Sequence, residues 1–456
     1  MPACTLDSRR RGVNMTEHGY DFITPDELRI GLFIDLQLGW MSHPFPKGSF
    51  KISSQKQIET LQGLGLERIR FVPSRSDAPP LDEPVQPEPQ ALDDSPGLGS
   101  GTLVEQALDY AGPNEHDAQR LRREHAELIR AQNDTLARCD KQFDHAIRQY
   151  RQVVERIGPE PKQAATLCGQ LVDTLVGDML GQSESSIRLL SETTGDRAWM
   201  HPVNVTVLSL LLGKAMGMTT QDLQHLGIAA FLHDVGKTRL PDRLRLVDPN
   251  FTPPEYRVYQ SHVAHGVSIA KQLGLLPEVQ RTIGEHHEMM DGSGFPCQLA
   301  AADISLCGKV LALVDRYENM CNPSRPVAAI TPHEALSLIF AQLKDRFDSA
   351  VLTAFIRMMG VYPPGSVVQL SDGRFAMVVS VNSNRPLKPQ VIVHEPSVPK
   401  DEALILNLEQ SPSAGIRRSI RPDLLPRAAI DYLSPRLRIC YFFERATDAA
   451  YSEASL

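Results

Sequence analysis

The chain carries His233-Asp234-Val-Gly-Lys237 and, further along, His286-His287-Glu-Met-Met-Asp291-Gly-Ser-Gly-Phe295-Pro296. These two segments place three histidines, two aspartates and a lysine in short stretches. Imidazole and carboxylate groups suit Mn, Fe or Zn, and a carboxylate, unlike an imidazole, can bridge two metals. The adjacent His-Asp and His-His pairs therefore indicate ligands for two cations, provided that the fold brings the pairs together.

The bulk composition is that of an ordinary soluble protein. The 456 residues are enough for about two to four domains, and 42% of them are apolar and 22% charged. A formal net charge of -8 argues against a general nucleic-acid binder, which needs a basic surface. A locally basic pocket for a small phosphate ester remains compatible with this charge.

Cysteine usage and the absence of long apolar runs predict a cytoplasmic protein. The seven cysteines are scattered without a CxxC pair, which favours reduced thiols over a disulfide scaffold. No apolar run reaches the ~18 residues that a membrane-spanning helix needs. The basic N-terminus lacks the apolar segment of a secretory signal, and Met15 is a candidate physiological start.

Turn residues and short apolar stretches divide the first part of the chain. We expect a disordered N-terminus over residues 1–21 and a small, mostly β domain over residues 22–75. Residues 76–112 are rich in Pro, Asp, Ser and Gly and are expected to form a flexible linker.

A long charged helix with one apolar stripe is predicted over residues 113–158. The stripe has two interpretations: it packs on its own domain, or it serves as a connector or dimer seam. Its members are Leu121, Leu128, Leu136, Phe143, Ile147, Tyr150, Val154 and Ile157.

The rest of the chain changes from a helical to an alternating pattern. Residues 160–360 are predicted to be helical, with segments at 164–179, 203–216, 223–233, 254–273, 277–286, 308–319 and 332–347. Residues 361–445 are predicted to form a small antiparallel β module, with Ser371-Asp372-Gly373 as a hairpin loop, and 446–456 a tail. The fold class is therefore multidomain and mainly α: an all-helical bundle flanked by two small β modules.

Histidines and aspartates recur on successive helices of the predicted bundle. A helical bundle builds metal sites from inward-facing side chains of neighbouring helices. The helix before His233 is apolar, so the His233-Asp234 pair lies at the inner end of a core helix, where ionisable groups need a compensating partner such as a metal. The set comprises His201, His233, Asp234, His262, His286, His287 and Asp315.

With these residues in view, the chain resembles the HD superfamily of metal-dependent phosphohydrolases. The second segment makes it similar to the HD-GYP branch, whose members cleave the bacterial second messenger cyclic di-GMP. The resemblance covers residues 190–360 and includes Leu240-Pro241-Asp242, His262 followed by Gly266, and Arg325-Pro326. The N-terminal Gly39-Trp40-Met-Ser-His-Pro-Phe-Pro resembles a small domain of unknown function that often precedes HD-GYP domains.

The resemblance implies that the seven residues above are metal ligands, with Asp234 as the bridge of a binuclear centre of Fe or Mn. It implies hydrolysis of cyclic di-GMP to linear pGpG by a metal-activated bridging water, with GMP as the alternative end product. Lys237, three residues after Asp234 on the same helix face, is expected to hold a phosphate oxygen, with a structural ion pair as the alternative. Arg325, Gly294, Phe295 and Pro296 are expected to contact the substrate.

Phe295 and Arg197 are departures from the family pattern. Phe295 replaces the family's tyrosine, so a stacking face is kept and a hydroxyl is lost. We expect this loss to affect the binding of partners, such as diguanylate cyclase (GGDEF) domains, more than the binding of metals. Arg197 stands where members with three metals carry glutamate, which favours two metals.

Two other functions are compatible with these residues. One is a catalytically silent cyclic di-GMP receptor or interaction module, favoured by Phe295 and by the altered spacing before Arg325. The other is an HD hydrolase of a different nucleotide, since the motifs specify phosphoester chemistry better than they specify the base.

Overall fold

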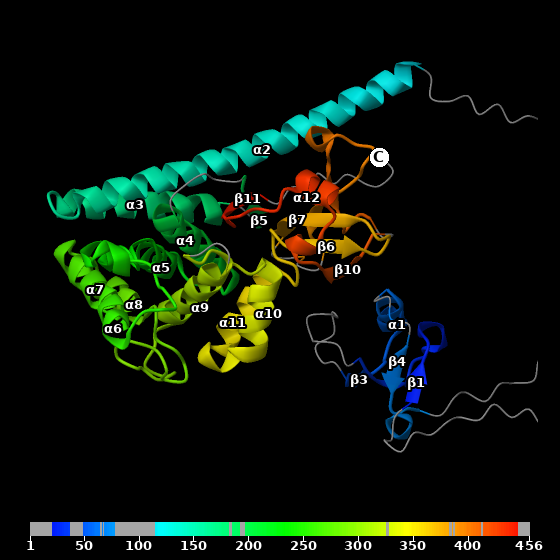
Figure 1. Cartoon of the computed structure of the whole chain (residues 1–456), viewed down its shortest axis with the longest axis horizontal. Coiled ribbons are helices and arrows are strands. Elements are labelled where there is room, and N and C mark those ends of the chain that lie inside the picture. The colour runs from blue at the N-terminus through cyan, green and yellow to red at the C-terminus, as the bar shows by residue number, and fades with distance from the viewer. Residues whose placement is uncertain are drawn as a thin grey trace, which may run out of the picture. The chain divides into compact units, whose positions relative to one another are not determined.

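The computed structural model describes residues 21–36, 49–63, 66, 68–77, 115–181, 185–191, 197–324, 328–382, 385, 388–411 and 414–445. The chain divides into two compact units, residues 1–127 and 128–456, which are considered separately below (Figure 1). The predictions for residues 1–20, for the linker from 78 to 112 and for the tail after 445 lie outside the described residues.

The first unit contains a four-stranded antiparallel sheet, which confirms the mostly β prediction. Its strand order is β1-β4-β2-β3, and α1 connects β3 to β4. Alternating apolar residues of the strands and the inner face of α1 form one core, which includes Ile34, Ile52, Leu61 and Ile69. The bounds are β1 (Asp21–Ile23), η1 (Pro25–Glu27), β2 (Phe33–Asp35), β3 (Ser49–Lys51), α1 (Gln55–Gln62), β4 (Ile69–Phe71) and η3 (Pro73–Arg75).

The long predicted helix is α2 (Glu115–Arg156). In the second unit, its stripe residues Phe143 and Tyr150 are buried, and so is Ile157 just beyond its end. The Tyr150 ring packs edge-on against Phe231, with ring centroids 5.0 Å apart. Packing on its own domain is therefore confirmed for this half of the stripe, whereas a dimer seam stays a prediction, and the side chain of Leu121 lies outside the described residues.

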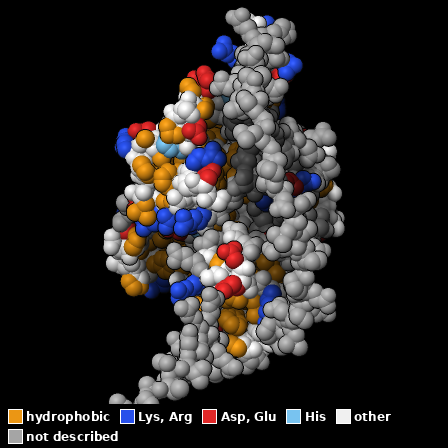
Figure 2. Space-filling model, turned by 90° about the vertical axis from the view of Figure 1, so that its right-hand side faces the viewer, with side chains coloured by type: hydrophobic (Ala, Val, Ile, Leu, Met, Phe, Trp, Pro, Cys, Tyr) orange, Lys and Arg blue, Asp and Glu red, His pale blue; other side chains and the backbone are white. Residues whose placement is uncertain are grey.

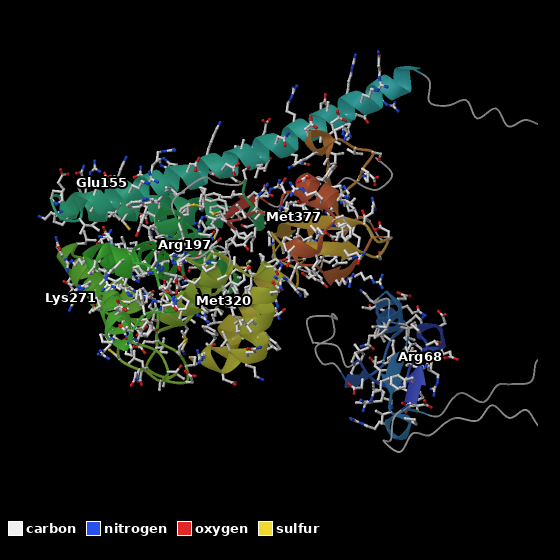
Figure 3. The ribbon with its side chains drawn as sticks, in the orientation of Figure 1. Arg68, Glu155, Arg197, Lys271, Met320 and Met377 are labelled. Carbon is white, nitrogen blue, oxygen red and sulfur yellow. The ribbon has the colours of Figure 1, made fainter. Side chains whose placement is uncertain are left out.

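The second unit is mainly helical, as predicted. Its central helices α4 and α5 are almost fully buried, because both are apolar around most of their circumference. Figure 3 shows the side chains that fill the space between these helices and their neighbours. The bounds are α3 (Pro161–Leu180), α4 (Arg197–Ala215), α5 (Thr220–Leu232), η4 (Val235–Arg239), η5 (Asp242–Leu244), α6 (Pro253–Gln260), α7 (His262–Gln272), α8 (Pro277–Glu285), α9 (Leu306–Cys321), α10 (Pro332–Gln342), η7 (Lys344–Arg346) and α11 (Ser349–Met359).

The single helix predicted over residues 254–273 is wrong. The structure has two helices, α6 and α7, which meet at Ser261. The apolar spacing continues across this junction, so periodicity alone could not reveal it. The break makes His262 the first residue of α7. The helix predicted over residues 332–347 likewise ends early, at Gln342, where α10 gives way to η7.

The antiparallel C-terminal module is confirmed, but it incorporates a strand from the region predicted to be all-helical. The strand order is β10-β6-β7-β5-β11, and β8 pairs with both β7 and β9. Strand β5 was missed because its partners β7 and β11 lie far downstream in the sequence. The bounds are β5 (Ser185–Leu189), β6 (Val367–Leu370), β7 (Phe375–Asn382), β8 (Gln390–Val393), η8 (Lys400–Glu402), β9 (Ile405–Asn407), β10 (Ile416–Ser419), η9 (Pro422–Leu424), α12 (Arg427–Leu433) and β11 (Tyr441–Arg445).

The described surface carries charges of both signs. On the face in Figure 2, basic and acidic side chains are interspersed with apolar ones rather than gathered by sign. This part of the surface therefore lacks the uniformly basic character of a nucleic-acid-binding face. Within the described ranges, no helix is both long and apolar enough to cross a membrane.

Candidate metal centre

The fold brings all seven predicted ligands into one buried cluster. His201 lies on α4 and Asp315 on α9, while His233 and Asp234 follow the last residue of α5. His262 begins α7, and His286 and His287 follow α8. Residues separated by more than a hundred positions thus converge at the centre of the helical bundle.

Asp234 lies in the middle of the cluster, and its two oxygens face different histidines. Its Oδ2 is 3.4 Å from His201 Nε2 and 3.6 Å from His233 Nε2. Its Oδ1 is 3.6 Å from His262 Nε2 and 3.9 Å from His286 Nε2. This is the arrangement that a carboxylate needs to bridge two cations.

Asp315, on α9, also faces the cluster. Its Oδ1 is 3.1 Å from His201 Nε2 and 3.5 Å from His233 Nε2. Its Oδ2 is 3.7 Å from His287 Nδ1. Among the described residues, Asp234 Oδ1 and His287 Nε2 are buried without a hydrogen-bond partner. Orphaned atoms of this kind call for a ligand, so the donor set fits divalent metals with imidazole and carboxylate preferences.

Three of the histidines are oriented by backbone carbonyls of the helix that precedes each of them. The Nδ1 atoms of His233, His262 and His286 lie 2.7, 2.6 and 2.6 Å from the carbonyl oxygens three residues earlier. A carbonyl only accepts hydrogen bonds, so each Nδ1 carries the proton. The Nε2 lone pairs are therefore left to point into the cluster, as metal ligation requires.

Burial and neighbouring charges set the protonation of the cluster. Burial lowers the pKa of His262 to about 4 and that of His287 to about 3, so both imidazoles are neutral at pH 7. Burial alone would also lower the pKa of His201, but nearby carboxylates, led by Glu318, raise it to about 10. Burial would raise the pKa of Asp234, yet the Lys237 ammonium and the histidines hold it well below its usual range. The carboxylates and the neutral His262 and His287 are therefore in the protonation states that bind metals, whereas His201 must release a proton when a metal binds.

Lys237 contacts the central carboxylate directly. Its Nζ is 2.5 Å from Asp234 Oδ2 and 5.4 Å from the centroid of the Tyr259 ring. The two side chains lie on the same face, as predicted, but the turn that carries them is the 3-10 helix η4 (Val235–Arg239) with Asp234 as its N-cap, since α5 ends at Leu232. This tighter turn directs the lysine back to the aspartate that precedes it.

The second motif forms a closed loop beside the cluster. The N–H of Phe295 donates to the carbonyl oxygen of His287 at 3.1 Å, and the Phe295 and His287 ring centroids are 4.6 Å apart. The buried Glu288 carboxylate accepts from the N–H groups of Cys297 and Leu299 at 2.6 and 2.9 Å. Gly294 is required here, because a Cβ would lie 2.5 Å from the carbonyl oxygen of His287.

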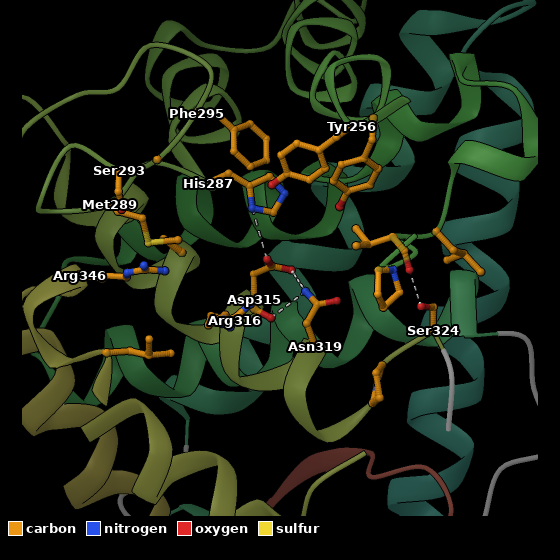
Figure 4. A pocket seen from close by; sticks show the side chains of 18 of the residues that line it. Tyr256, His287, Met289, Ser293, Phe295, Asp315, Arg316, Asn319, Ser324 and Arg346 are labelled. Atoms are coloured by element: carbon orange, nitrogen blue, oxygen red, sulfur yellow. Dashed lines mark hydrogen bonds and ion pairs between the residues drawn. The ribbon is translucent and has the colours of Figure 1, made fainter. Parts of the chain in front are cut away.

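A cavity of about 400 Å³ opens from the cluster (Figure 4). In Figure 4 the rings of Phe295 and Tyr256 lie above His287 and Asp315, and the Arg346 side chain extends toward the same space from the left. The Phe295 and Tyr256 centroids are 6.3 Å apart in an edge-on arrangement. The cavity thus combines apolar ring faces with cationic groups beside His287 and Asp315.

Of the other predicted substrate contacts, only some line the cavity. Gly294 and Phe295 line the cavity, whereas Pro296 is exposed and is not among its lining residues. Arg325 lies outside the described residues.

Three residues near the site were not identified from the sequence. Glu318 follows Asp315 by three positions on α9, so helical spacing could have revealed that it shares a face with that ligand. Tyr256 and Arg346 line the cavity from other elements, and no sequence signal connects either of them to the motifs.

Comparisons with known proteins identify two domains in the chain. Residues 179–351 match a family model described as HD domain, and residues 22–168 match one described as domain of unknown function (DUF3391). A helical domain with this buried His/Asp cluster defines the HD class. The chain therefore contains an HD domain that follows a DUF3391 domain, and this combination agrees with the resemblance to the HD-GYP branch.

Relatives in three bacteria share parts of the chain. It is 27% identical over 374 residues to "Cyclic di-GMP phosphodiesterase PA4108" of Pseudomonas aeruginosa, covering 80% of this chain and 83% of that protein. It is 30% identical over 187 residues to a "Cyclic di-GMP phosphodiesterase" of Thermotoga maritima, covering 40% of this chain and 50% of that protein. It is 26% identical over 164 residues to "3'3'-cGAMP-specific phosphodiesterase 3" of Vibrio cholerae, covering 36% of this chain and 35% of that protein.

Proposed function

We propose that this protein is a metal-dependent phosphodiesterase that hydrolyses cyclic di-GMP to linear pGpG, and further to GMP. The observation that carries the proposal is one cluster of seven ligand-type side chains, Asp234 among them, beside a cavity with aromatic and cationic walls. The names of the Pseudomonas aeruginosa and Thermotoga maritima relatives support the substrate.

The ligand set divides into two groups that share Asp234. One group contains His201 and His233, and the other contains His262, His286 and His287; Asp315 faces both groups. We therefore propose two metal positions, filled by Fe or Mn, with Asp234 as the bridge. When bound, the two metals would lower the pKa of a water molecule and neutralise charge on the phosphate oxygens. Arg197 places a buried guanidinium next to this set, 3.8 Å from Glu318, which favours two metals over three.

The chain's own residues would position the phosphodiester and stabilise its charge. Lys237 can donate to a nonbridging phosphate oxygen as negative charge develops there, because its ammonium already lies at Asp234 beside the cavity. In the hydrolysis, the water oxygen bonds to phosphorus, the bond from phosphorus to the 3'-oxygen breaks, and that oxygen takes up a proton. The ring opens to a linear dinucleotide with a 5'-phosphate.

The cavity offers two further contacts for a cyclic dinucleotide. The faces of Phe295 and Tyr256 can stack on a nucleobase, and Phe295 does so without the hydroxyl that the family's tyrosine would add. Arg346 reaches the same cavity from the connection between α10 and α11. A guanidinium there can pair with the phosphate that is not being cleaved. Arg325 stays a predicted phosphate contact.

The proposal is tested by a turnover assay on protein purified without oxygen and loaded with Fe or Mn. Metal content is measured on the same sample, and products are separated from cyclic di-GMP by chromatography. We expect pGpG as the first product and GMP after it. If the protein binds two metals and leaves cyclic di-GMP intact, the hydrolase proposal is wrong; a binding titration then decides whether the protein is a silent receptor.

A second substrate is favoured by one comparison. The Vibrio cholerae relative is named for 3'3'-cGAMP, which differs from cyclic di-GMP in one base. A panel of cyclic dinucleotides assayed side by side would show which combination of two bases the protein hydrolyses fastest. GGDEF domains as partners and a homodimer through α2 are further proposals, to be tested by co-purification and by measuring the molar mass in solution.

A further inference from the structure

One ligand-type histidine is held differently from the others. His201 Nδ1 hydrogen bonds to the Glu318 carboxylate, whereas the Nδ1 atoms of His233, His262 and His286 contact backbone carbonyls. Glu318 lies on α9 with only 2% of its surface exposed. A carboxylate is a stronger acceptor than a neutral carbonyl, so His201 is both oriented and made more electron-rich.

Glu318 is itself held by a buried polar network. Its Oε1 accepts from Asn322 Nδ2 at 2.9 Å and from Asn204 Nδ2 at 3.3 Å. Arg197 Nη2 lies 3.8 Å from its Oε2. A buried carboxylate is costly unless it is paired and hydrogen-bonded, and here both oxygens have partners. The carboxylate is therefore fixed in place rather than free to rotate.

The two asparagines connect this network to the C-terminal strand. Asn322 donates to the carbonyl oxygen of Ile439 at 2.7 Å and accepts from its N–H at 2.8 Å. Asn204 donates to the same carbonyl at 3.1 Å and accepts from the N–H of Tyr441 at 2.9 Å. The backbone of Ile439, two residues before β11, and of Tyr441, its first residue, thus holds both amides in the orientation that presents their N–H groups to Glu318.

We propose that Glu318 is a positioning residue that holds His201 with Nδ1 protonated and Nε2 aimed at the metal position shared with His233 and Asp315. This inference rests on the metal centre of the proposed function. It means that one of the two metal positions depends on Glu318 more than the other does, because His262, His286 and His287 have no contact with this carboxylate among the described residues. It also means that residues at the start of β11 complete the support of the metal centre.

The experiment is a calorimetric titration of the full-length, metal-free protein with Mn²⁺, for the wild type and for Glu318→Gln. Glutamine keeps the size and an acceptor oxygen but removes the charge. We expect the wild type to bind Mn²⁺ at two sites. In Glu318→Gln, we expect the Mn²⁺ affinity of one site to fall by about 10- to 100-fold and that of the other site to stay unchanged.

Glu285→Gln is the matched control. Glu285 is also a buried carboxylate, at 3% exposure, but it binds the N–H and hydroxyl of Ser305 and pairs with Arg281 rather than with a histidine. We expect a lower unfolding midpoint for this variant and two unchanged Mn²⁺ affinities. If Glu318 had a merely structural role, Glu318→Gln would likewise lower the unfolding midpoint and leave both Mn²⁺ affinities unchanged.

The inference is overturned if Glu318→Gln binds Mn²⁺ like the wild type, or if both sites weaken equally. If the wild type itself binds no Mn²⁺, the proposed metal centre fails and the inference with it. Should Glu318→Gln not fold, Glu318→Asp keeps the charge but shortens the side chain. About tenfold weakening of one site supports the inference in that variant, and wild-type affinity at both sites overturns it.

Discussion

Gly236 allows η4 to approach α7 closely, and its replacement by alanine tests how rigidly the cluster is held. A Cβ at this position would lie 1.9 Å from the carbonyl oxygen of His262 and 2.5 Å from the N atom of Gly266. Both neighbours are backbone atoms, so neither can rotate away. The two segments must move apart by roughly 1 Å, the difference between 1.9 Å and the 3.0 Å limit for such contacts.

The displacement affects both stability and metal binding. Inserting a methyl group into a packed interior costs about 1–3 kcal/mol. The shift also moves Asp234 away from His262. In the wild-type structure, Asp234 Oδ1 lies 3.6 Å from His262 Nε2. Metal sites tolerate changes of about 0.2 Å in ligand distance, so we expect Gly236→Ala to lose metal as well as stability.

Thermal unfolding with and without metal, together with metal analysis, measures both effects. Gly177→Ala is the control, since Gly177 is exposed within α3 and its added Cβ would meet no atom within 4 Å. That change should stabilise the helix by about 0.5–1 kcal/mol and leave the metals in place. A Gly236→Ala protein with the wild-type midpoint and two metals would refute the reasoning.

Three further substitutions separate the roles of the site residues. Asp234→Ala should abolish binding of both metals and turnover, because it removes the shared carboxylate; metal analysis showing one retained metal would contradict the bridge. Lys237→Ala should keep both metals and lower kcat by about 10²–10³, and loss of metal would instead assign the lysine a structural role. Phe295→Tyr should leave the metal content unchanged, so any change is expected in KM or in partner binding, and altered metal stoichiometry would contradict this assignment.

Most of the helical domain could be predicted because its elements are defined locally. The apolar spacing of α3, α5 and α9 and the start signals of α8 and α10 are contained within each segment. The break between α6 and α7 and the strand β5 could not be predicted in this way. The first leaves the apolar period intact, and the second exists only because β7 and β11 pair with it from far along the chain.

The candidate site shows the same division. His233-Asp234 and His286-His287 are adjacent pairs, so their chemistry is visible in the sequence itself. The role of Glu318 depends on α4 packing against α9, and that of Asn204 and Asn322 depends on the segment that leads from Ile439 into β11. Tyr256 and Arg346 meet at the cavity from separate elements, which local patterns do not report.

The sequence by itself determined the residue types of the metal centre, the mainly helical fold and the HD-GYP resemblance. These properties depend on motifs and periodicities within short segments. Only the tertiary structure decided that Asp234 presents one oxygen to each group of histidines and that Lys237 turns back to Asp234 through a 3-10 helix. It also decided that the C-terminal strand supports His201 through Glu318. Apart from the local Lys237–Asp234 pair, these contacts join distant parts of the chain, and packing rather than local propensity sets their geometry.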